Sequence, residues 1–256
     1  MNGLFIYTVG SILMPSVLIT GGTRGIGLAL CKGFAQKGWA VATCYHQDEE
    51  SAVVAQTEML KITPSYFISK CDVSMETDVK NLVQNTLEKF AALDCVIHNA
   101  GATWNARILN VEESQWNDTL GVHLKGAFLL SKACLKPMLK QRSGHMVFIS
   151  SVVATTGNIG QGAYTAAKAG VIGFARSVAQ EYGGKNIRAN VICPGFHKTR
   201  IADNLSPEAE ELIRKRHLLG RTADLSDVVD FTVWLAGTRS ISGQVFNLDS
   251  RLPGWL

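Results

Sequence analysis

The chain has 256 residues, of which 46% are hydrophobic and 18% are charged, and its formal net charge is +4. Such a chain is long enough for one large globular domain or two small ones. Its lysines and arginines are scattered rather than clustered, which argues against a nucleic-acid-binding protein. No repeat, low-complexity segment or Pro/Gly/Ser-rich linker marks a boundary, so we expect a single domain.

The chain begins with an apolar stretch, LFIYTVGSILMPSVLI, that Gly10 and Pro15 interrupt. It is shorter than the roughly 20 residues that a membrane-spanning helix needs. It also lacks the basic region and small-residue cleavage site of a secretory signal. Because Met14 directly precedes a complete predicted strand, we expect residues 1–13 to be an N-terminal extension and residues 14–256 to be the functional domain. A membrane anchor is the alternative.

The chain contains six cysteines, and no two of them form a C-x-x-C pair. Several lie inside apolar runs that are typical of a protein core. This pattern favours free, reduced thiols in a cytosolic protein over disulfides or a metal site. The cysteines are Cys31, Cys44, Cys71, Cys95, Cys134 and Cys193.

Short β-rich runs alternate with longer helical patterns along the chain. The runs are continuously apolar, which is expected when helices cover both faces of a parallel sheet. The repeated strand–helix units predict an α/β fold, a Rossmann-type doubly wound parallel sheet of seven strands. The predicted strands are 16–20, 39–45, 65–73, 93–101, 145–151, 187–195 and 242–249. The predicted helices are 27–37, 48–60, one that ends at residue 90, 115–140 and 162–183.

The sequence ITGGTRGIG, residues 19–27, links the first predicted strand to the first predicted helix. Its glycines do not follow the usual G-x-G-x-x-G spacing, and it is not followed by the Gly-Lys-Ser/Thr of a P-loop. Glycines in such a turn allow a tight reversal and a close backbone approach to a pyrophosphate, while the helix N-terminus supplies free N–H groups. A strand–helix turn without a ligand is the alternative.

Tyr164 and Lys168 stand four residues apart in YTAAK, so they share one face of a predicted helix. An ammonium beside a phenol stabilises the phenolate, and the lower pKa makes tyrosine a usable general acid and base near neutral pH. Ser150 and Ser151 end a predicted strand, and open α/β sheets bind ligands beyond the carboxyl ends of their strands. Taken alone, Tyr164 and Lys168 could be an ordinary surface pair. Taken alone, the two serines could be an ordinary strand end.

Together these stretches resemble the short-chain dehydrogenase/reductase family. TGGTRGIG, HNAG at residues 98–101, a serine thirteen residues before YTAAK, and PGF with Thr199 after it follow the order of that family. The likeness runs from about residue 15 to residue 249. Within the family, ISSVVATTGNIGQGAYTAAKAGVIGFARS and NVICPGFHKT are most similar to the 3-oxoacyl-(acyl-carrier-protein) reductases.

The resemblance implies a role for each matched residue and implies no metal. Tyr164 would protonate the carbonyl oxygen as hydride arrives, and Lys168 would bind the nicotinamide ribose and lower the tyrosine pKa. Ser151, rather than Ser150, would hydrogen-bond the substrate oxygen. The implied cofactor contacts are Gly21, Thr23, Arg24, Gly25, Ile26 and Gly27 at the pyrophosphate turn; Tyr45 and His46 after the second strand; Asp72 and Val73 at the adenine; Asn99, Ala100 and Gly101 along the cofactor; and Pro194, Gly195 and Thr199 at the nicotinamide.

The resemblance further favours NADP(H) over NAD(H). NAD-selective members carry an aspartate at the end of the second strand, where this chain has Tyr45 or His46. The acidic residues at 48–50 are better interpreted as the first turn of a helix, where the helix dipole favours them. Arg24 resembles the arginine that NADP-dependent members place against the 2′-phosphate. A solvated loop arginine is the alternative.

Two features depart from the family pattern. His123, in GVHLKGAF, stands where most members have an asparagine that completes a catalytic tetrad. A histidine ring can both donate and accept hydrogen bonds, so we expect activity to survive, and a purely structural His123 is the alternative. The C-terminal NLDSRLPGWL keeps Asp249 but has Ser250 and Arg251 in place of the family's two glycines. We still expect a homotetramer or dimer.

The segment SPEAEELIRKRHLLGR, residues 206–221, predicts a short helical lid over the substrate. Arg142 matches a position that holds the acidic carrier protein in the resembled reductases, and Lys185 occupies a second such position where arginine is usual. Isolated solvated charges are the alternative. We therefore expect a cytoplasmic, NADPH-dependent reductase of 3-oxoacyl thioesters, carried on acyl carrier protein, in fatty-acid or related lipid or polyketide synthesis. A carbonyl reductase or alcohol dehydrogenase for another small substrate, and a dinucleotide-binding regulator without turnover, are the alternatives.

Overall fold

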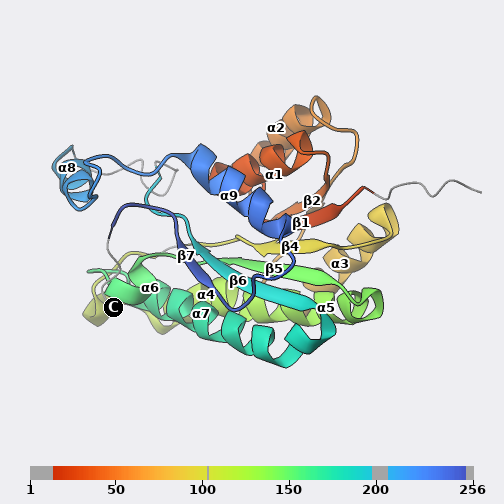
Figure 1. Cartoon of the computed structure of the whole chain (residues 1–256). Helices are drawn as coiled ribbons and strands as arrows, with labels where there is room; N and C mark the ends of the chain where they lie inside the picture. Colours follow the sequence, from red (N-terminus) through yellow and green to blue (C-terminus); the bar gives the residue numbers. More distant parts are fainter. Residues whose placement is uncertain (1–13, 103, 198–206, 252–256) are drawn as a thin grey trace, which may run out of the picture.

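A computed structural model describes residues 14–102, 104–197 and 207–251 of the chain. Within these residues, seven strands form one parallel sheet in the order β3-β2-β1-β4-β5-β6-β7 (Figure 1). This is the predicted doubly wound arrangement. The strands are β1 (Ser16–Thr20), β2 (Ala40–Tyr45), β3 (Tyr66–Lys70), β4 (Cys95–His98), β5 (Gly144–Ile149), β6 (Ile187–Cys193) and β7 (Val245–Asn247).

Each crossover between strands carries helical structure, which keeps the strands parallel. The α-helices are α1 (Gly25–Gln36), α2 (Glu49–Leu60), α3 (Glu76–Phe90), α4 (Glu113–Leu120), α5 (Gly126–Gln141), α6 (Val153–Thr156), α7 (Gly162–Tyr182), α8 (Pro207–Lys215) and α9 (Leu225–Gly237). Three short segments add the 3₁₀ turns η1 (Ile108–Asn110) and η3 (Gly183–Lys185) and the π-helical turn η2 (Gly121–Lys125).

Helices cover both faces of the sheet (Figure 1). One core lies between the sheet and α1, α2 and α9, and it includes Ile19, Phe34 and Leu235. The second core lies between the sheet and α3, α5 and α7, and it includes Leu18 and Leu130. Consecutive residues of β1 thus enter different cores, because side chains of a strand point alternately to its two faces. Burial on both faces explains why the strands are continuously apolar.

The structure differs from the predicted elements in two places. The helix predicted at 115–140 is divided into α4, η2 and α5, because the π-helical turn interrupts the α-helical hydrogen bonding at Gly121–Lys125. Helix α9, which our sequence analysis did not predict, packs against α1 and completes one layer. Its N-terminus is capped by Asp224, whose side chain accepts a hydrogen bond from the Ser226 N–H.

All six cysteines are free and buried, as predicted. Over the described ranges, no three histidine, cysteine or acidic side chains are grouped so that they could hold a metal ion. The helices in that part of the chain are also too short or too polar to cross a membrane.

Candidate functional site

The carboxyl ends of β1, β4, β5 and β6 bring the predicted site residues to one edge of the sheet. Gly21 follows β1, Asn99 follows β4, Ser151 follows shortly after β5, and Pro194 follows β6. The strand order reverses direction between β1 and β4. Doubly wound sheets bind ligands in the crevice that such a reversal creates.

The glycine turn occupies the junction of β1 and α1. Helix α1 begins at Gly25 and has no acidic residue in its first turn, so its N–H groups and dipole are available to an anion. A Cβ on Gly27 would lie 2.1 Å from the carbonyl oxygen of Gly21, so only glycine allows this approach. Thr23 is buried and Ile26 is partly exposed beside them. The turn therefore has the compact backbone that the pyrophosphate prediction requires.

Asn99 joins this turn to β4. Its Nδ2 donates to the carbonyl oxygens of Thr20 and Gly21 at 3.0 and 3.2 Å. The Thr20 hydroxyl in turn accepts from the backbone N–H groups of Asn99 and Ala100 at 3.1 and 3.0 Å. These four bonds hold the ends of β1 and β4 as one unit.

Ser151, Tyr164 and Lys168 lie together beyond the end of β5. The Lys168 ammonium lies 5.6 Å from the centroid of the Tyr164 ring, and the Ser151 side chain is near enough to Tyr164 to lower its pKa. Lys168 Nζ donates to the carbonyl oxygen of Ile149 at 2.6 Å. Ser150 points elsewhere, because its hydroxyl donates to the backbone oxygen of Lys168 at 2.9 Å. The geometry thus groups Ser151, and not Ser150, with the tyrosine.

The pKa of the tyrosine differs from the prediction. Burial raises the pKa of Tyr164 above its ordinary value, and the hydrogen bond from Ser151 offsets only part of that effect. Burial also lowers the pKa of Lys168 to about 8. The net shift is opposite in direction to the predicted one, because the effect of burial exceeds the effects that favour the phenolate. The Tyr164 hydroxyl therefore keeps its proton at neutral pH and is available as an acid.

His123 is carried into this group by η2. Its side chain is only 2% exposed, and its ring lies edge-on to the Tyr164 ring with centroids 5.1 Å apart. The Nε2–H donates to the carbonyl oxygen of Ala102 at 2.7 Å, whereas Nδ1 is buried without a partner among the described residues. A Cβ on Gly101 would lie 2.4 Å from the histidine Cε1, so the ring uses the space that this glycine leaves. Burial, followed by the nearby charge of Lys168, lowers the pKa of His123 well below its ordinary value.

His98 is a positioning residue that sequence reasoning missed. Its Nε2–H donates to the backbone oxygen of His123 at 3.0 Å, and its Nδ1 faces the Thr20 hydroxyl at 3.5 Å. Burial lowers the pKa of His98 to about 3, so the ring is neutral and can use one nitrogen as donor and the other as acceptor. Only the position of His98 in HNAG hinted at this contact, because the bond joins residues that are 25 positions apart.

Arg24 lies at the outer side of the glycine turn. Its guanidinium forms an ion pair of 2.7 Å with Asp48, and more than half of the side-chain surface is exposed. Asp48 also caps α2 by accepting from the Ser51 N–H, and Glu49 and Glu50 form the first turn of that helix. The acidic residues are thus the helix start that was predicted. The ion pair holds Arg24 beside the end of β2.

The predicted adenine contacts lie next to this pair. Tyr45 ends β2, and His46 directly follows it with its Nε2 3.7 Å from Asp72. One carboxylate oxygen of Asp72 accepts from both the backbone N–H and the hydroxyl of Ser74. Hydrogen bonds from Ser74, and more weakly the charge of His46, lower the pKa of Asp72 against the opposing effect of burial. Val73 is buried behind them.

Pro194 and Gly195 follow β6, whereas Thr199 lies outside the described residues. Gly195 has a φ of +86°, and a Cβ there would lie 2.7 Å from the Cβ of Asp249. The loop at Pro194 and Gly195, which was predicted to contact the nicotinamide, therefore packs on Asp249. Asp249 is the C-terminal residue that matches the family pattern.

The C-terminal segment also anchors the end of the predicted lid. The Asp249 side chain is fully buried and accepts from both the backbone N–H and the guanidinium of Arg251. His217, which follows α8, lies 3.7 Å from the same carboxylate. The backbone oxygen of Ser250 accepts from the Leu218 N–H at 3.1 Å. Ser250 and Arg251, which replace the family's two glycines, thus connect the C-terminal segment with the base of α8.

Arg142 and Lys185 are not near this group. Arg142 follows α5 directly before β5, and Lys185 ends η3 directly before β6. The two segments are in contact, because Asn186 Nδ2 donates to the backbone oxygen of Arg142 at 2.9 Å. Both cations thus lie where strands begin, at the edge opposite Tyr164. Neither can contact a small substrate in the site of its own subunit.

Comparisons with known proteins agree with this arrangement. The family model described as short chain dehydrogenase matches residues 15–210. The chain is 34% identical to the 3-oxoacyl-[acyl-carrier-protein] reductase FabG of Chlamydia trachomatis, over 94% of this chain and 98% of that protein. The Pseudomonas aeruginosa RhlG/NADP active-site complex is similar with a TM-score of 0.86 and 26% identity, over 94% of this chain and 96% of that one. An actinorhodin polyketide ketoreductase variant with NADPH gives a TM-score of 0.88 and 26% identity, over 94% and 98% of the two chains. This chain belongs to the short-chain dehydrogenase family.

Proposed function

We propose that this chain is an NADPH-dependent oxidoreductase that reduces a 3-oxoacyl thioester, carried on acyl carrier protein, to the 3-hydroxyacyl thioester. The observation that carries the proposal is the group of Ser151, Tyr164 and Lys168 at the carboxyl edge of the sheet, beside a turn that suits a pyrophosphate. The similarity to FabG over almost the whole of both chains supports the substrate class. Fatty-acid synthesis, or a related lipid or polyketide route, is the corresponding process.

The residues of the site fit a nicotinamide dinucleotide phosphate. The backbone around Gly21 and Gly27 leaves no room for side chains, and the first turn of α1 carries no opposing carboxylate. Arg24 would meet the 2′-phosphate, and Asn99 would keep the adjacent segment in place. The cofactor, when bound, supplies the hydride that adds to the carbonyl carbon.

The side chains of the group then handle the proton and the substrate oxygen. Tyr164 donates its hydroxyl proton to the carbonyl oxygen as the carbon is reduced, and Ser151 hydrogen-bonds to that oxygen. Lys168, cationic below about pH 8, stabilises the phenolate that remains. The unpartnered Nδ1 of His123 gives the site a neutral hydrogen-bond acceptor beside the tyrosine.

Oxidation of NADPH by an acetoacetyl thioester tests this function. The wild-type protein should oxidise NADPH rapidly, and Tyr164→Phe should lower kcat at least 100-fold, since positioned proton transfer contributes roughly that much. Tyr182→Phe, at the other end of the same helix, is the matched control and should retain activity. Tyr164→Phe with near-wild-type kcat would refute the assigned proton donor.

A second candidate is the reduction of a ketone that is not a 3-oxoacyl thioester. The similarity to a polyketide ketoreductase bound to NADPH favours this possibility. A panel of acyl-carrier thioesters and free cyclic ketones separates the two functions. Turnover of the cyclic ketones alone would favour the second candidate, and NADPH binding without any turnover would indicate a regulator.

We further propose that residues 14–256 form one catalytic domain of a cytoplasmic homotetramer. Exposed aromatic side chains on two helices support assembly: Trp234 on α9 is 57% exposed and Phe128 on α5 is 45% exposed. Burial of such side chains between subunits is favourable. Sedimentation analysis of the wild-type protein and of Phe128→Ser and Trp234→Ser tests the assembly, and a monomer at micromolar concentration would contradict it.

A further inference from the structure

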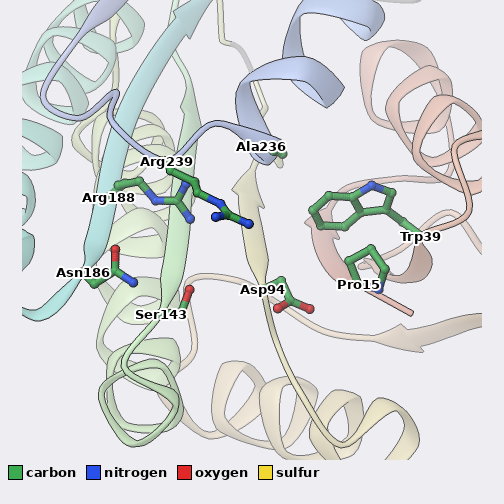
Figure 2. Close-up of a pocket in the computed structure, with 9 residues that line it drawn as sticks. Pro15, Trp39, Asp94, Ser143, Asn186, Arg188, Ala236 and Arg239 are labelled. Atoms are coloured by element: carbon green, nitrogen blue, oxygen red, sulfur yellow. The ribbon is translucent and has the colours of Figure 1, made fainter. Parts of the chain in front are cut away.

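A hollow of about 480 Å³ lies at the edge of the sheet where the strands begin. The segments before β1, β2, β4 and β5, the start of β6 and the end of α9 form its wall (Figure 2). Because the predicted catalytic residues lie beyond the carboxyl ends of the strands, this hollow is a separate feature of the fold. Its volume falls within the range of roughly 300–1,000 Å³ that small-molecule sites have in proteins.

Two arginines extend into one side of the hollow. Figure 2 shows Arg188, from β6, beside Arg239, which follows α9. Burial first, and the charge of Arg239 as well, lower the pKa of Arg188, which indicates that like charges lie close together. The Nε of Arg188 is buried without a hydrogen-bond acceptor, and neither guanidinium forms an ion pair within the described ranges. A buried N–H donor without an acceptor costs free energy of folding, so an anion beside the two arginines would be stabilising.

The neighbouring groups do not balance the charge of both arginines. Asp94 also lines the hollow, but its Oδ2 accepts from the backbone N–H of Ser16 at 2.8 Å and from its hydroxyl at 3.4 Å, and among the described residues it forms no ion pair with either arginine. Its single charge balances at most one of the two guanidinium groups. His145 is uncharged at neutral pH, because burial and the charge of Arg188 lower its pKa to about 4. Burial raises the pKa of the Cys95 thiol, which is therefore also uncharged. The side of the hollow at the two arginines thus keeps a net positive charge.

The opposite side of the hollow is apolar. Trp39 and Pro15 line it across from the arginines, as Figure 2 shows. The Trp39 ring is held edge-on against Phe34, with centroids 5.1 Å apart. The hollow therefore offers a fixed aromatic surface and a pair of guanidinium groups to the same ligand.

We propose that this hollow binds a small organic phosphate, with the phosphate between Arg188 and Arg239 and the organic part against Trp39. A phosphate monoester carries close to two negative charges at neutral pH, which matches the two guanidinium groups. The ligand class follows from charge and surface alone and does not depend on the reaction at the other edge.

Thermal unfolding with phenyl phosphate tests the site. Saturating NADP⁺ is kept present so that the glycine turn and Arg24 are occupied, and ionic strength is matched with sodium chloride. A ligand that binds only the folded state raises Tm, and we expect a rise of about 3 °C at ten times Kd. Arg239→Gln should abolish most of this rise. The matched control, Arg142→Gln, removes an exposed cation from the same edge but outside the hollow and should leave the rise unchanged.

Calorimetric titration then separates the possible ligands. One site per chain, with phenyl phosphate bound at least tenfold more tightly than inorganic phosphate and the preference lost in Trp39→Ala, supports an organic phosphate. Equal affinity for the two phosphates would overturn the role of Trp39. A Tm rise retained in Arg239→Gln, or lost equally in Arg142→Gln, would overturn the site. Either result would show that the two arginines only stabilise the C-terminal end of the α9 dipole or contribute to diffuse surface charge.

Discussion

The ring of His123 lies edge-on to the ring of Tyr164, and its Nδ1 is buried without a hydrogen-bond partner in the described part of the chain. Two backbone-directed bonds fix this arrangement: the ring donates to Ala102, and His98 donates to the histidine's own carbonyl oxygen. The histidine is therefore held as a neutral acceptor beside the proposed proton donor. It does not act as an additional cation.

Replacement of His123 should lower activity without changing its pH dependence. His123→Ala removes a buried hydrogen bond and leaves a cavity, so we expect a loss of about 1–3 kcal/mol of stability and a fall in kcat. Because burial, followed by the charge of Lys168, lowers the pKa of His123 well below its ordinary value, the ring is neutral in the wild type at neutral pH. The profile of kcat against pH between pH 6 and 8 should keep its shape. His46→Ala, which removes an exposed histidine, is the control, and a displaced acid limb in His123→Ala would contradict a neutral ring.

The alkaline limit of the reaction should reflect Lys168. Its pKa of about 8 means that the ammonium is present below that pH and lost above it. We therefore expect kcat for ketone reduction to fall above about pH 8. Lys168→Arg keeps its positive charge at pH values far above 8, so any activity that this variant retains should not decline above pH 8. Lys132→Arg, an exposed lysine on α5, is the control. A wild-type profile that is flat to pH 10 would refute the assignment.

Arg24 should determine the preference between the two coenzymes. Arg24→Gln removes the cation beside the end of β2, so kcat/KM for NADPH should fall about tenfold, the effect of about 1.4 kcal/mol. The value for NADH should change little. Lys32→Gln is a matched control, since Lys32 lies on α1, the helix that follows Arg24, and also forms an ion pair of 2.7 Å, with Glu58. Equal losses for both coenzymes in Arg24→Gln would refute a contact with the 2′-phosphate.

Arg142 and Lys185 should affect carrier-bound substrates only. Both lie at the edge opposite Tyr164, so Arg142→Glu and Lys185→Glu should leave KM for a small acetoacetyl thioester unchanged. In the same two variants, KM for an acyl-carrier-protein substrate should rise several-fold. In the wild type, this KM should increase with salt concentration, because salt screens exposed charges. A carrier KM that is insensitive to both substitutions and to salt would show that these are isolated solvated charges.

Much of this architecture could be predicted because it depends on local patterns. The apolar runs identified the parallel sheet, and the spacing of Tyr164 and Lys168 placed them on one helix face. The direction of the shift in the Tyr164 pKa could not be predicted, since it depends mainly on how deeply the side chain is buried. The contact of His98 with His123 was also inaccessible, because it joins two strand–helix units. Helix α9 was overlooked although Asp224 provided a capping signal.

The π-helical turn at Gly121–Lys125 has a consequence for the phase of the helices on either side. One additional residue in a regular α-helix would rotate everything that follows by about 100°, and the wider π-helical turn takes up that residue without the rotation. Helices α4 and α5 are therefore continuous along the chain but present faces that no single helical wheel describes. Deletion of one residue from this turn would restore a regular helix and leave the packing face of α5 toward the sheet. The irregularity thus lets this turn hold an additional residue and bring His123 into the site while α5 still packs in the core.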